Sequence, residues 1–433
     1  MTLARAWRLT LALSCLAGIP VAQAQLVSSP RPFDVMHYAA RIEPDLAQQS
    51  LQGQATLQVR MTRAGIRTIA LDRGDIAIDS ARERGRELEY TIDGKRLRLT
   101  FARPSRAGER RVFQLRYHAA PKFGLEFHPE REQIYTIFST SQWLPSIDAP
   151  DERATLDLEV ILPQGLAAVG SGRAQPPQRQ QDGRMLHRWR QRVPVPAYAY
   201  GFAAGRFTEV VQRDRGSQRR YLADGFDADQ LRRMFADTGE MLAFFAAKAG
   251  VRYSGDAYTQ ALVAETIGQE HAGFALMSEQ YGRDVLAMPD NVALIAHEAA
   301  HQWWGNRVTC SSWNHFWLNE GFANFMAAAY LEHRYGRAAY ERQVEGWRKR
   351  VERLRNEGKN KPLVFPEWNH PSADDRAVVY QKGAYMLHLL RGRMGDAAFW
   401  RGVRDYTRAH IDGTVETRDF EQAMQRHSRD DLA

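Results

Sequence analysis

The sequence predicts a multidomain fold, in which an N-terminal antiparallel β-sandwich-like domain precedes a mostly α-helical domain. Three observations support this prediction. The chain has 433 residues, enough for two or three domains, and an ordinary globular balance of charged and hydrophobic residues. Short alternating segments dominate up to about residue 212, whereas amphipathic helical segments dominate after about residue 221. Two histidines four residues apart lie within this helical half.

The first 24 residues are typical of a secretory signal peptide. Arg5 and Arg8 precede the apolar run Leu9–Ala17, and Ala22-Gln23-Ala24 then offers a small-residue cleavage site. An N-terminal membrane anchor is the alternative, but the apolar run is short, and no later run is long enough to span a bilayer. We therefore expect an exported bacterial protein, periplasmic or secreted, without an integral membrane segment once the signal is removed.

Charge and cysteine content exclude other classes. The formal charge is +8, but basic residues are interspersed with acidic ones, which indicates a solvated surface and no nucleic-acid partner. After signal removal Cys310 is the one remaining cysteine, so no intramolecular disulfide can form, and a structural thiol is the expected role. Composition leaves the oligomeric state open.

Residues 25–212 are predicted to form the β domain. Asp93-Gly94 is a hairpin turn signal between two strand-like segments. Segments that alternate or run apolar at strand length are Gln54–Val59, Thr68–Leu71, Glu87–Ile92, Leu97–Phe101, Val112–Tyr117 and Thr155–Leu162.

Residues 213–433 are predicted to form the helical domain, with a short strand at Thr259–Val263 near its start. Helical periodicity together with start and stop signals predicts helices at Asp229–Lys248, Asp290–Trp304, Leu318–Tyr335, Ala338–Glu357, Ala377–Met394, Asp396–His410 and Thr417–Arg426.

The helix predicted at Asp290–Trp304 carries a metal-site pattern. His297 and His301 lie one helical turn apart on one face, a spacing that lets both imidazoles hold one Zn²⁺ ion. Glu298 between them is placed to take a proton from an attacking water. Glu320, on the next predicted helix, would complete a His₂Glu site with an open fourth position, the catalytic type of zinc site.

Other interpretations of these residues are weaker. Two satisfied histidines on a buried helix would give the same pattern, and Glu320 could be an exposed acid that favours the helix dipole. Apolar neighbours of both segments favour an inward-facing role. The other common zinc pattern needs a glycine and a third histidine where this chain has Trp304 and Arg307, which excludes that class.

These motifs closely resemble those of the aminopeptidase N-like gluzincin metallopeptidases, peptidase family M1, which also contains leukotriene hydrolase. The resemblance implies a thermolysin-like zinc catalytic domain after the β domain. It covers nearly all of the mature chain. The stretches that carry it are residues 33–38 (FDVMHY), 144–150 (LPSIDAP), 297–306 (HEAAHQWWGN), 317–323 (WLNEGFA) and 380–384 (YQKGA).

The resemblance also implies roles for individual residues. The zinc ligands would be His297, His301 and Glu320, binding one ion per chain, and the general base would be Glu298. Tyr380 would donate a hydrogen bond to the oxyanion, although a core aromatic at the start of a helix is the alternative. Two further residues, Glu270 and Gly273, would bind the substrate; the Glu270 carboxylate would hold its free α-amine, unless it is merely a loop acid.

Three positions depart from the family pattern. Thr136 stands where relatives place a Gln or Glu that helps to hold the amine, and His271 replaces the usual Asn beside Glu270. His271 is therefore either a substrate contact or a loop residue. The chain ends at Ala433, where relatives continue into further helices, and we expect a truncated chain or fragment.

Together these observations predict a zinc-dependent aminopeptidase that hydrolyses the N-terminal peptide bond of peptides with a free N-terminus, through a water activated by zinc. Two alternatives remain open. One is a hydrolase of the same type with a different specificity. The other is a non-catalytic zinc- or peptide-binding relative.

Overall fold

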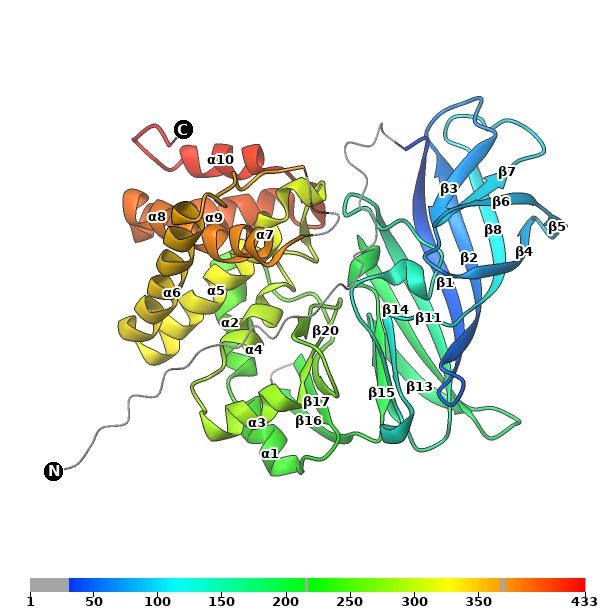
Figure 1. Ribbon diagram of the computed structural model, residues 1–433, viewed down its shortest axis with the longest axis horizontal. Coiled ribbons are helices and arrows are strands. Elements are labelled where there is room, and N and C mark those ends of the chain that lie inside the picture. The colour runs from blue at the N-terminus through cyan, green and yellow to red at the C-terminus, as the bar shows by residue number, and fades with distance from the viewer. Residues whose placement is uncertain (1–30, 215–216, 367, 369–370, 433) are drawn as a thin grey trace.

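The computed structural model describes residues 31–214, 217–366, 368 and 371–432 (Figure 1). The predicted signal peptide, residues 1–24, lies outside the described residues. A β-rich part, mostly blue to green, stands beside a helical part, green to red (Figure 1). The predicted order of a β domain followed by a mostly helical domain is therefore confirmed. None of the helices in the described part of the chain has the length and apolar character needed to cross a membrane.

Three sheets form the β-rich part, and their apolar faces enclose one core that runs from Phe33 to Ala272. Strand β8, Arg110–Ala119, alternates exposed and buried residues along its whole length, as expected for a strand with one face on the core. Neighbouring strands pair antiparallel except β1 and β11, which are parallel.

The eight-stranded sheet has the order β13 (Arg173–Arg179), β14 (Met185–Pro196), β11 (Arg153–Leu162), β1 (Phe33–Asp45), β2 (Ser50–Met61), β8, β4 (Ala77–Glu83) and β5 (Arg86–Glu87). The four-stranded sheet has the order β12 (Ala167–Gly170), β15 (Phe202–Gly205), β10 (Gln133–Thr136) and β9 (Leu125–His128). The three-stranded sheet has the order β3 (Thr68–Asp72), β7 (Arg96–Thr100) and β6 (Glu89–Asp93).

A five-stranded sheet begins the second part, in the order β16 (Thr208–Asp214), β17 (Ser217–Ala223), β18 (Ala257–Val263), β20 (Phe274–Ser278) and β19 (Gly268–Gln269). The expected domain boundary, between residues 212 and 213, falls inside β16. That strand pairs with β17 along its whole length, so it belongs to this sheet and not to the β domain. A small parallel pair joins β21 (Val308–Cys310) to β22 (Gly413–Val415).

The helices follow the predicted order with local differences. The single helix predicted at Asp229–Lys248 is two helices, because Asp227 caps the first and the chain turns before Thr238. The helix α3 was not predicted from the sequence. The α-helices are α1 (Ala228–Met234), α2 (Thr238–Ala249), α3 (Glu279–Ala287), α4 (Ala293–Ala300), α5 (Trp317–Tyr335), α6 (Arg337–Asn356), α7 (Ala373–Ala377), α8 (Gly383–Met394), α9 (Asp396–His410) and α10 (Thr417–Gln425).

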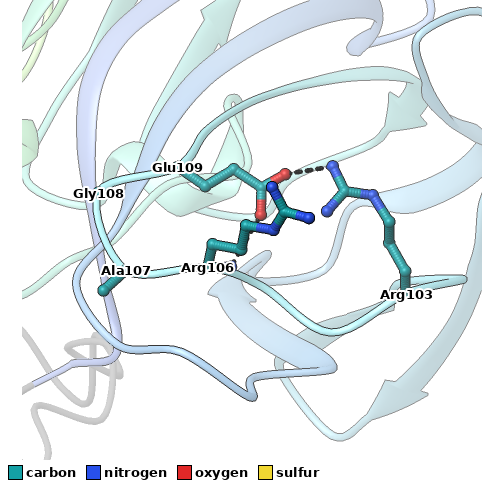
Figure 2. Close-up of a pocket in the computed structure, with 5 residues that line it drawn as sticks. All are labelled: Arg103, Arg106, Ala107, Gly108 and Glu109. Atoms are coloured by element: carbon teal, nitrogen blue, oxygen red, sulfur yellow. Dashed lines mark hydrogen bonds and ion pairs between the residues drawn. The ribbon is translucent and has the colours of Figure 1, made fainter.

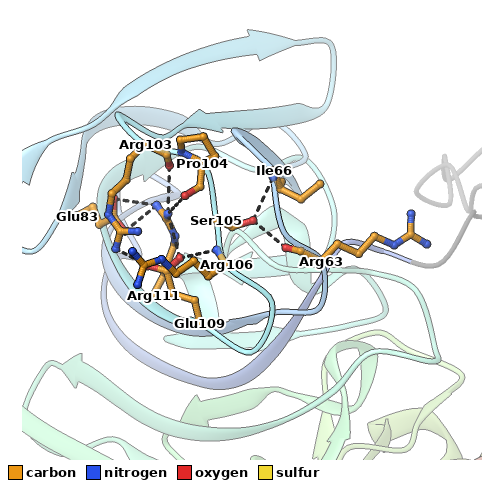
Figure 3. A network of polar contacts seen from close by, with 9 residues as sticks. All are labelled: Arg63, Ile66, Glu83, Arg103, Pro104, Ser105, Arg106, Glu109 and Arg111. Carbon is orange, nitrogen blue, oxygen red and sulfur yellow. Dashed lines mark hydrogen bonds and ion pairs between the residues drawn. The ribbon is translucent and has the colours of Figure 1, made fainter.

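The turn between β7 and β8 closes one end of the β domain with a polar cluster. The buried Arg111 guanidinium donates to Glu83 at 3.1 Å and to the Arg103 carbonyl at 3.1 Å (Figure 3). It also lies 4.3 Å from the Phe101 ring centre. A shallow pocket in the same turn is lined by Arg103, Arg106, Ala107, Gly108 and Glu109 (Figure 2). The Glu109 carboxylate forms ion pairs with both Arg103 and Arg111. We therefore interpret this cluster as structural: it holds the turn between β7 and β8 in place.

Candidate zinc site

Two neighbouring helices bring the three predicted ligands together. His297 lies on α4, His301 lies in the turn that directly follows it, and Glu320 lies in the first turn of α5. The two Nε2 atoms are 3.0 Å apart. Oε2 of Glu320 lies 3.3 Å from Nε2 of His297 and 3.4 Å from Nε2 of His301. All three side chains are buried.

These separations fit a zinc ion. Four ligands placed tetrahedrally at about 2.0–2.1 Å from an ion lie roughly 3.3 Å from one another. The three observed distances between ligand atoms, 3.0, 3.3 and 3.4 Å, are close to that edge length. Two imidazole nitrogens and one carboxylate oxygen are also the donor set that Zn²⁺ accepts in catalytic sites.

The tautomer of His301 is fixed by the chain itself. Its Nδ1 donates to the carbonyl of Trp304 at 2.9 Å, so Nε2 is the ring nitrogen left to bind a metal ion. The turn needs Gly305, whose φ is +132° and whose place would put a Cβ only 2.8 Å from Nδ1 of His301. The backbone conformation from His301 to Asn306 therefore fixes the orientation of the His301 ring.

The electrostatics of the site favour a positive charge among the ligands. Burial alone would raise the pKa of Glu320, but the adjacent His301 and His297 lower it to about 2. Burial would lower the pKa of His301, but the carboxylates of Glu320 and Glu270 raise it to about 10. The site therefore has several buried carboxylates close to His301, and a bound divalent cation would neutralise their negative charge.

Glu298 points into the same space. Its carboxylate is 3% exposed, and its Oε2 has no hydrogen-bond partner among the described residues. Burial, followed by the charge of Glu270, raises the pKa of Glu298 well above its ordinary value, although His301 opposes that shift. Gly268 leaves room for this carboxylate, because a Cβ there would lie 1.9 Å from Oε1 of Glu298. An unpaired buried oxygen of this kind is suited to accept a proton from water.

Tyr380 lies beside the first ligand. Its ring stacks on the imidazole of His297 with 6.2 Å between centroids, and burial raises the pKa of its phenol well above the ordinary value, so the hydroxyl keeps its proton. The helix predicted at Ala377–Met394 is wound as a π-helix over Val378–Lys382, where Tyr380 is central. Gly321 and Gly383 let α5 and α8 approach closely, because a Cβ on Gly321 would lie 2.9 Å from Cα of Gly383.

Glu270 reaches the site from the loop after β19. Ligand atoms of Glu270, Glu298 and His301 all lie within 4.8 Å of one another. The backbone of this loop is held by the segment after α4: Asn306 donates to the Glu270 carbonyl at 2.9 Å, and Gln302 donates to the His271 carbonyl at 3.0 Å. The structure therefore brings the predicted amine-binding carboxylate next to the predicted metal ligands.

Gly273 lies in the turn that follows the Glu270 loop, and its backbone groups bond within the protein. Its φ is +88°, its N–H donates to the Gln302 side chain at 2.9 Å, and its carbonyl accepts from Thr259 at 3.1 Å. Both backbone groups are thus engaged within the protein. In this structure Gly273 shapes the turn that follows Glu270, and its predicted contact with the substrate stays a prediction.

Thr136 and His271, two of the departures from the family pattern, contact each other. His271 is buried, its Nε2 lies 3.0 Å from the Thr136 carbonyl, and its ring stacks on Phe274. Burial lowers the pKa of His271 to about 4, so it is neutral and donates this hydrogen bond. Gly201 provides the space, since a Cβ there would lie 2.3 Å from the His271 ring. His271 is therefore a loop residue that ties the Glu270 loop to β10.

The β domain also supports the ligands directly, which the sequence did not reveal. The Tyr198 hydroxyl donates to the Gly305 carbonyl at 2.9 Å and accepts from the Asn319 amide at 3.1 Å. Asn319 directly precedes Glu320. Arg153 donates to the Asn306 carbonyl at 3.0 Å. These bonds join the β domain to the two segments that carry the second and third ligands.

Comparison with known proteins agrees with this geometry. A family model described as the peptidase family M1 domain matches residues 238–433. The chain carries a peptidase family M1 domain. The matched residues include all three predicted zinc ligands, Glu298 and Tyr380, so the resemblance expected from the sequence is confirmed.

Solved structures share both domains of this M1 fold. The M1 zinc metallopeptidase from Deinococcus radiodurans superimposes with a TM-score of 0.80 at 26% identity, covering 92% of this chain and 91% of that one. A mutant of that enzyme bound to a Tyr-Ser-Ala substrate gives a TM-score of 0.79 at 25% identity, with the same coverage. The expected fold and a zinc-metallopeptidase framework are therefore confirmed.

Curated relatives fall into two groups. Leukotriene A-4 hydrolase of Xenopus laevis is 23% identical, and the match covers 93% of this chain and 70% of the relative. Leucine aminopeptidase 2 of Aspergillus clavatus is 27% identical, and the match covers 59% of this chain and 42% of the relative. The chain thus spans less than half of the length of that second relative.

Proposed function

We propose that the protein is a zinc-dependent aminopeptidase that hydrolyses the first peptide bond of peptides with a free N-terminus. One observation carries the proposal. A ligand triad with tetrahedral spacing lies beside two further buried carboxylates, Glu298 and Glu270, one suited to move a proton and one suited to bind an ammonium group. Relatives named as leucine aminopeptidases support the same activity.

His297, His301 and Glu320 would hold one zinc ion per chain. When bound, zinc supplies Lewis-acid polarisation of the scissile carbonyl and lowers the pKa of water toward neutrality. Glu298 accepts the proton of the attacking water and then delivers it to the leaving amine, which fits its burial and its raised pKa. Tyr380 donates a hydrogen bond to the developing oxyanion with a phenol that stays protonated.

Glu270 restricts cleavage to the first peptide bond of the substrate. Its carboxylate binds the α-ammonium group by a charge-assisted contact, which places the first peptide bond at the metal. The proximity of Glu270 to Glu298 and His301 supports this role. The substrate class is accordingly a peptide with a free amino terminus.

The experiment is a chelator-and-zinc-readdition assay on aminoacyl reporter substrates, each tested with a free and with an N-acetylated amine. We expect activity to disappear with the chelator, to return with zinc, and to be restricted to the free-amine substrates. Equal rates on blocked substrates would favour a hydrolase of different specificity. A zinc-loaded protein that is silent on the whole panel would favour the non-catalytic alternative.

The resemblance to leukotriene A-4 hydrolase supports a second candidate, hydrolysis of a non-peptide substrate at the same site. The aminoacyl reporter panel does not contain such a substrate, so leukotriene A-4 itself is the direct test. Hydrolysis of leukotriene A-4 that survives replacement of Glu270, while peptide hydrolysis does not, would establish it as a second activity.

Export of the protein is also part of the proposal. Arg5, Arg8 and the apolar run Leu9–Ala17 before Ala22-Gln23-Ala24 support a cleaved signal, and the buried Cys310 needs no disulfide partner. N-terminal sequencing of the protein from a periplasmic extract should find Gln25 first. An intact N-terminus in the cytoplasmic fraction would contradict export.

A further inference from the structure

We propose that Gln269 is a positioning residue for the Glu270 carboxylate. Its side-chain amide is held by the β domain and in turn fixes the orientation of that carboxylate. This inference rests on the proposed function, because it concerns how the α-amine of the substrate is recognised. Gln269 is 1% exposed and is the last residue of β19. Neither the triad nor the proton-transfer chemistry accounts for an amide buried at this point.

The hydrogen bonds of Gln269 determine which way its amide faces. Its Oε1 accepts the backbone N–H of Phe138 at 2.7 Å. A backbone N–H can only donate, so the oxygen must face Phe138 and the NH₂ group must face the other way. There Nε2 donates to Oε2 of Glu270 at 2.9 Å. The orientation of the Gln269 amide is therefore set by the β-domain backbone and passed on to the carboxylate.

Both ends of this link are held rigidly. Strand β19 pairs with β20, with Gln269 opposite Leu276, so the backbone of Gln269 is fixed by the sheet. Phe138 has a φ of +53°, an unusual conformation for a non-glycine residue, and the adjacent Ser139 N–H bonds to the Ile137 carbonyl at 2.7 Å. Such backbone conformations persist where surrounding contacts determine them, and they cluster at functional sites.

The consequence for recognition is specific. Glu270 has one oxygen bound to Gln269, and its carboxylate also lies within 4.8 Å of ligand atoms of Glu298 and His301. A carboxylate held in one orientation binds an ammonium group without losing side-chain freedom at that moment, which strengthens binding and aligns the first peptide bond. A substrate without a free amine gains nothing from this arrangement.

The test is Gln269→Met, which keeps the length of the side chain and removes both hydrogen bonds. We expect KM for free-amine aminoacyl substrates to rise about tenfold with little change in kcat, and activity on N-acetylated substrates to stay at the wild-type level. Bound zinc should remain at the wild-type content. The measurements are steady-state kinetics on both substrate forms and metal analysis of the purified variant.

Gln133→Met is the matched control. Gln133 is also buried, its Oε1 accepts a backbone N–H from Ala264 at 3.0 Å, and its Nε2 donates to the carboxylate of Glu279 at 3.2 Å. Gln133→Met therefore also loses one bond from a backbone N–H and one to a carboxylate, but Gln133 does not contact Glu270. We expect its ratio of free-amine to blocked activity to equal that of the wild type.

The outcomes separate the inference from the proposed function. If the wild type prefers free amines and Gln269→Met keeps its KM, or if Gln133→Met raises KM equally, the positioning role of Gln269 is wrong. If the wild type itself does not prefer free amines, the proposed function fails first. If Gln269→Met does not fold, Gln269→Glu provides the second measurement. It keeps the acceptor for Phe138 and replaces the donor to Glu270 with a like charge, so a wild-type KM in that variant would overturn the inference.

Discussion

Replacing Tyr198 with phenylalanine should weaken zinc binding, although Tyr198 belongs to the β domain and is not a ligand. Its hydroxyl bridges the Gly305 carbonyl, at 2.9 Å, and the side-chain amide of Asn319, at 3.1 Å. Phenylalanine keeps the ring, which packs edge-on against Trp313, and removes only the hydroxyl. The variant therefore tests the bridge and leaves the packing in place.

The expected loss of zinc affinity follows from the groups that lose a hydrogen bond when the Tyr198 hydroxyl is removed. The Gly305 carbonyl still accepts from Thr309 at 2.6 Å, but the buried Asn319 amide loses its bond to Tyr198. An unpaired buried donor costs about 1–3 kcal/mol. Groups that orient metal ligands typically contribute 10- to 100-fold in metal affinity, which is about 1.4–2.7 kcal/mol. The two ranges agree, so we expect the zinc dissociation constant to rise about 10- to 100-fold.

The assay is competition for zinc against a fluorescent chelator, together with urea unfolding of the metal-free proteins. Tyr200→Phe is the matched control, because the Tyr200 hydroxyl donates to the Ala154 carbonyl at 2.6 Å, away from the ligands. It should lower stability without changing zinc affinity. Wild-type zinc affinity in Tyr198→Phe, or an equal loss in both variants, would refute the reasoning.

Three further outcomes are expected. Glu298→Gln should keep its zinc and lose nearly all turnover, because an amide cannot accept the proton; retention of more than a small fraction of kcat would exclude Glu298 as the base. Tyr380→Phe should lower kcat about 10²- to 10³-fold with little change in KM, and an unchanged kcat would return Tyr380 to a packing role. Burial and the Asp72 carboxylate raise the pKa of Asp148 to about 7, so the folded state binds an extra proton between about pH 4 and 7. The free energy of unfolding should therefore fall as pH rises from about 4 to 7, by at most about 4 kcal/mol over that range, and level off above 7. Asp148→Asn should lack this fall in urea unfolding from pH 4 to pH 8.5; an identical pH profile in both proteins would show that Asp148 does not titrate there.

The ligand set was predictable because its information is local in sequence. His297 and His301 are one helical turn apart, so any helix at that point must place them on one face. Glu320 needed one further assumption, that the next helix packs against α4, and its apolar neighbours supported that assumption. The regular spacing of residues on a helix thus determines the relative position of the two histidine ligands before any tertiary contact is known.

The supporting groups were not predictable, because each depends on contacts between distant segments. Tyr198 meets Asn319 across 121 residues, and Phe138 meets Gln269 across 131 residues. Neither pair has a periodicity or a turn signal. The break between α1 and α2 was missed for a related reason: the apolar pattern continues across it, and the turn over residues 235–237 that separates the two helices contains no glycine or proline.

The arrangement of these supports bears on why the chemistry uses two domains. The β domain bonds to the segment that follows α4 and to the start of α5, and through Gln269 it also orients Glu270. An aminopeptidase must keep the separation between its metal and its amine-binding carboxylate constant, because that separation defines which peptide bond is cut. A loop acid alone would vary in position as the loop moves. Tying the loop and the ligand helices to one rigid β framework holds that separation fixed, so a mutation in the β domain is expected to change substrate selection without touching a catalytic group.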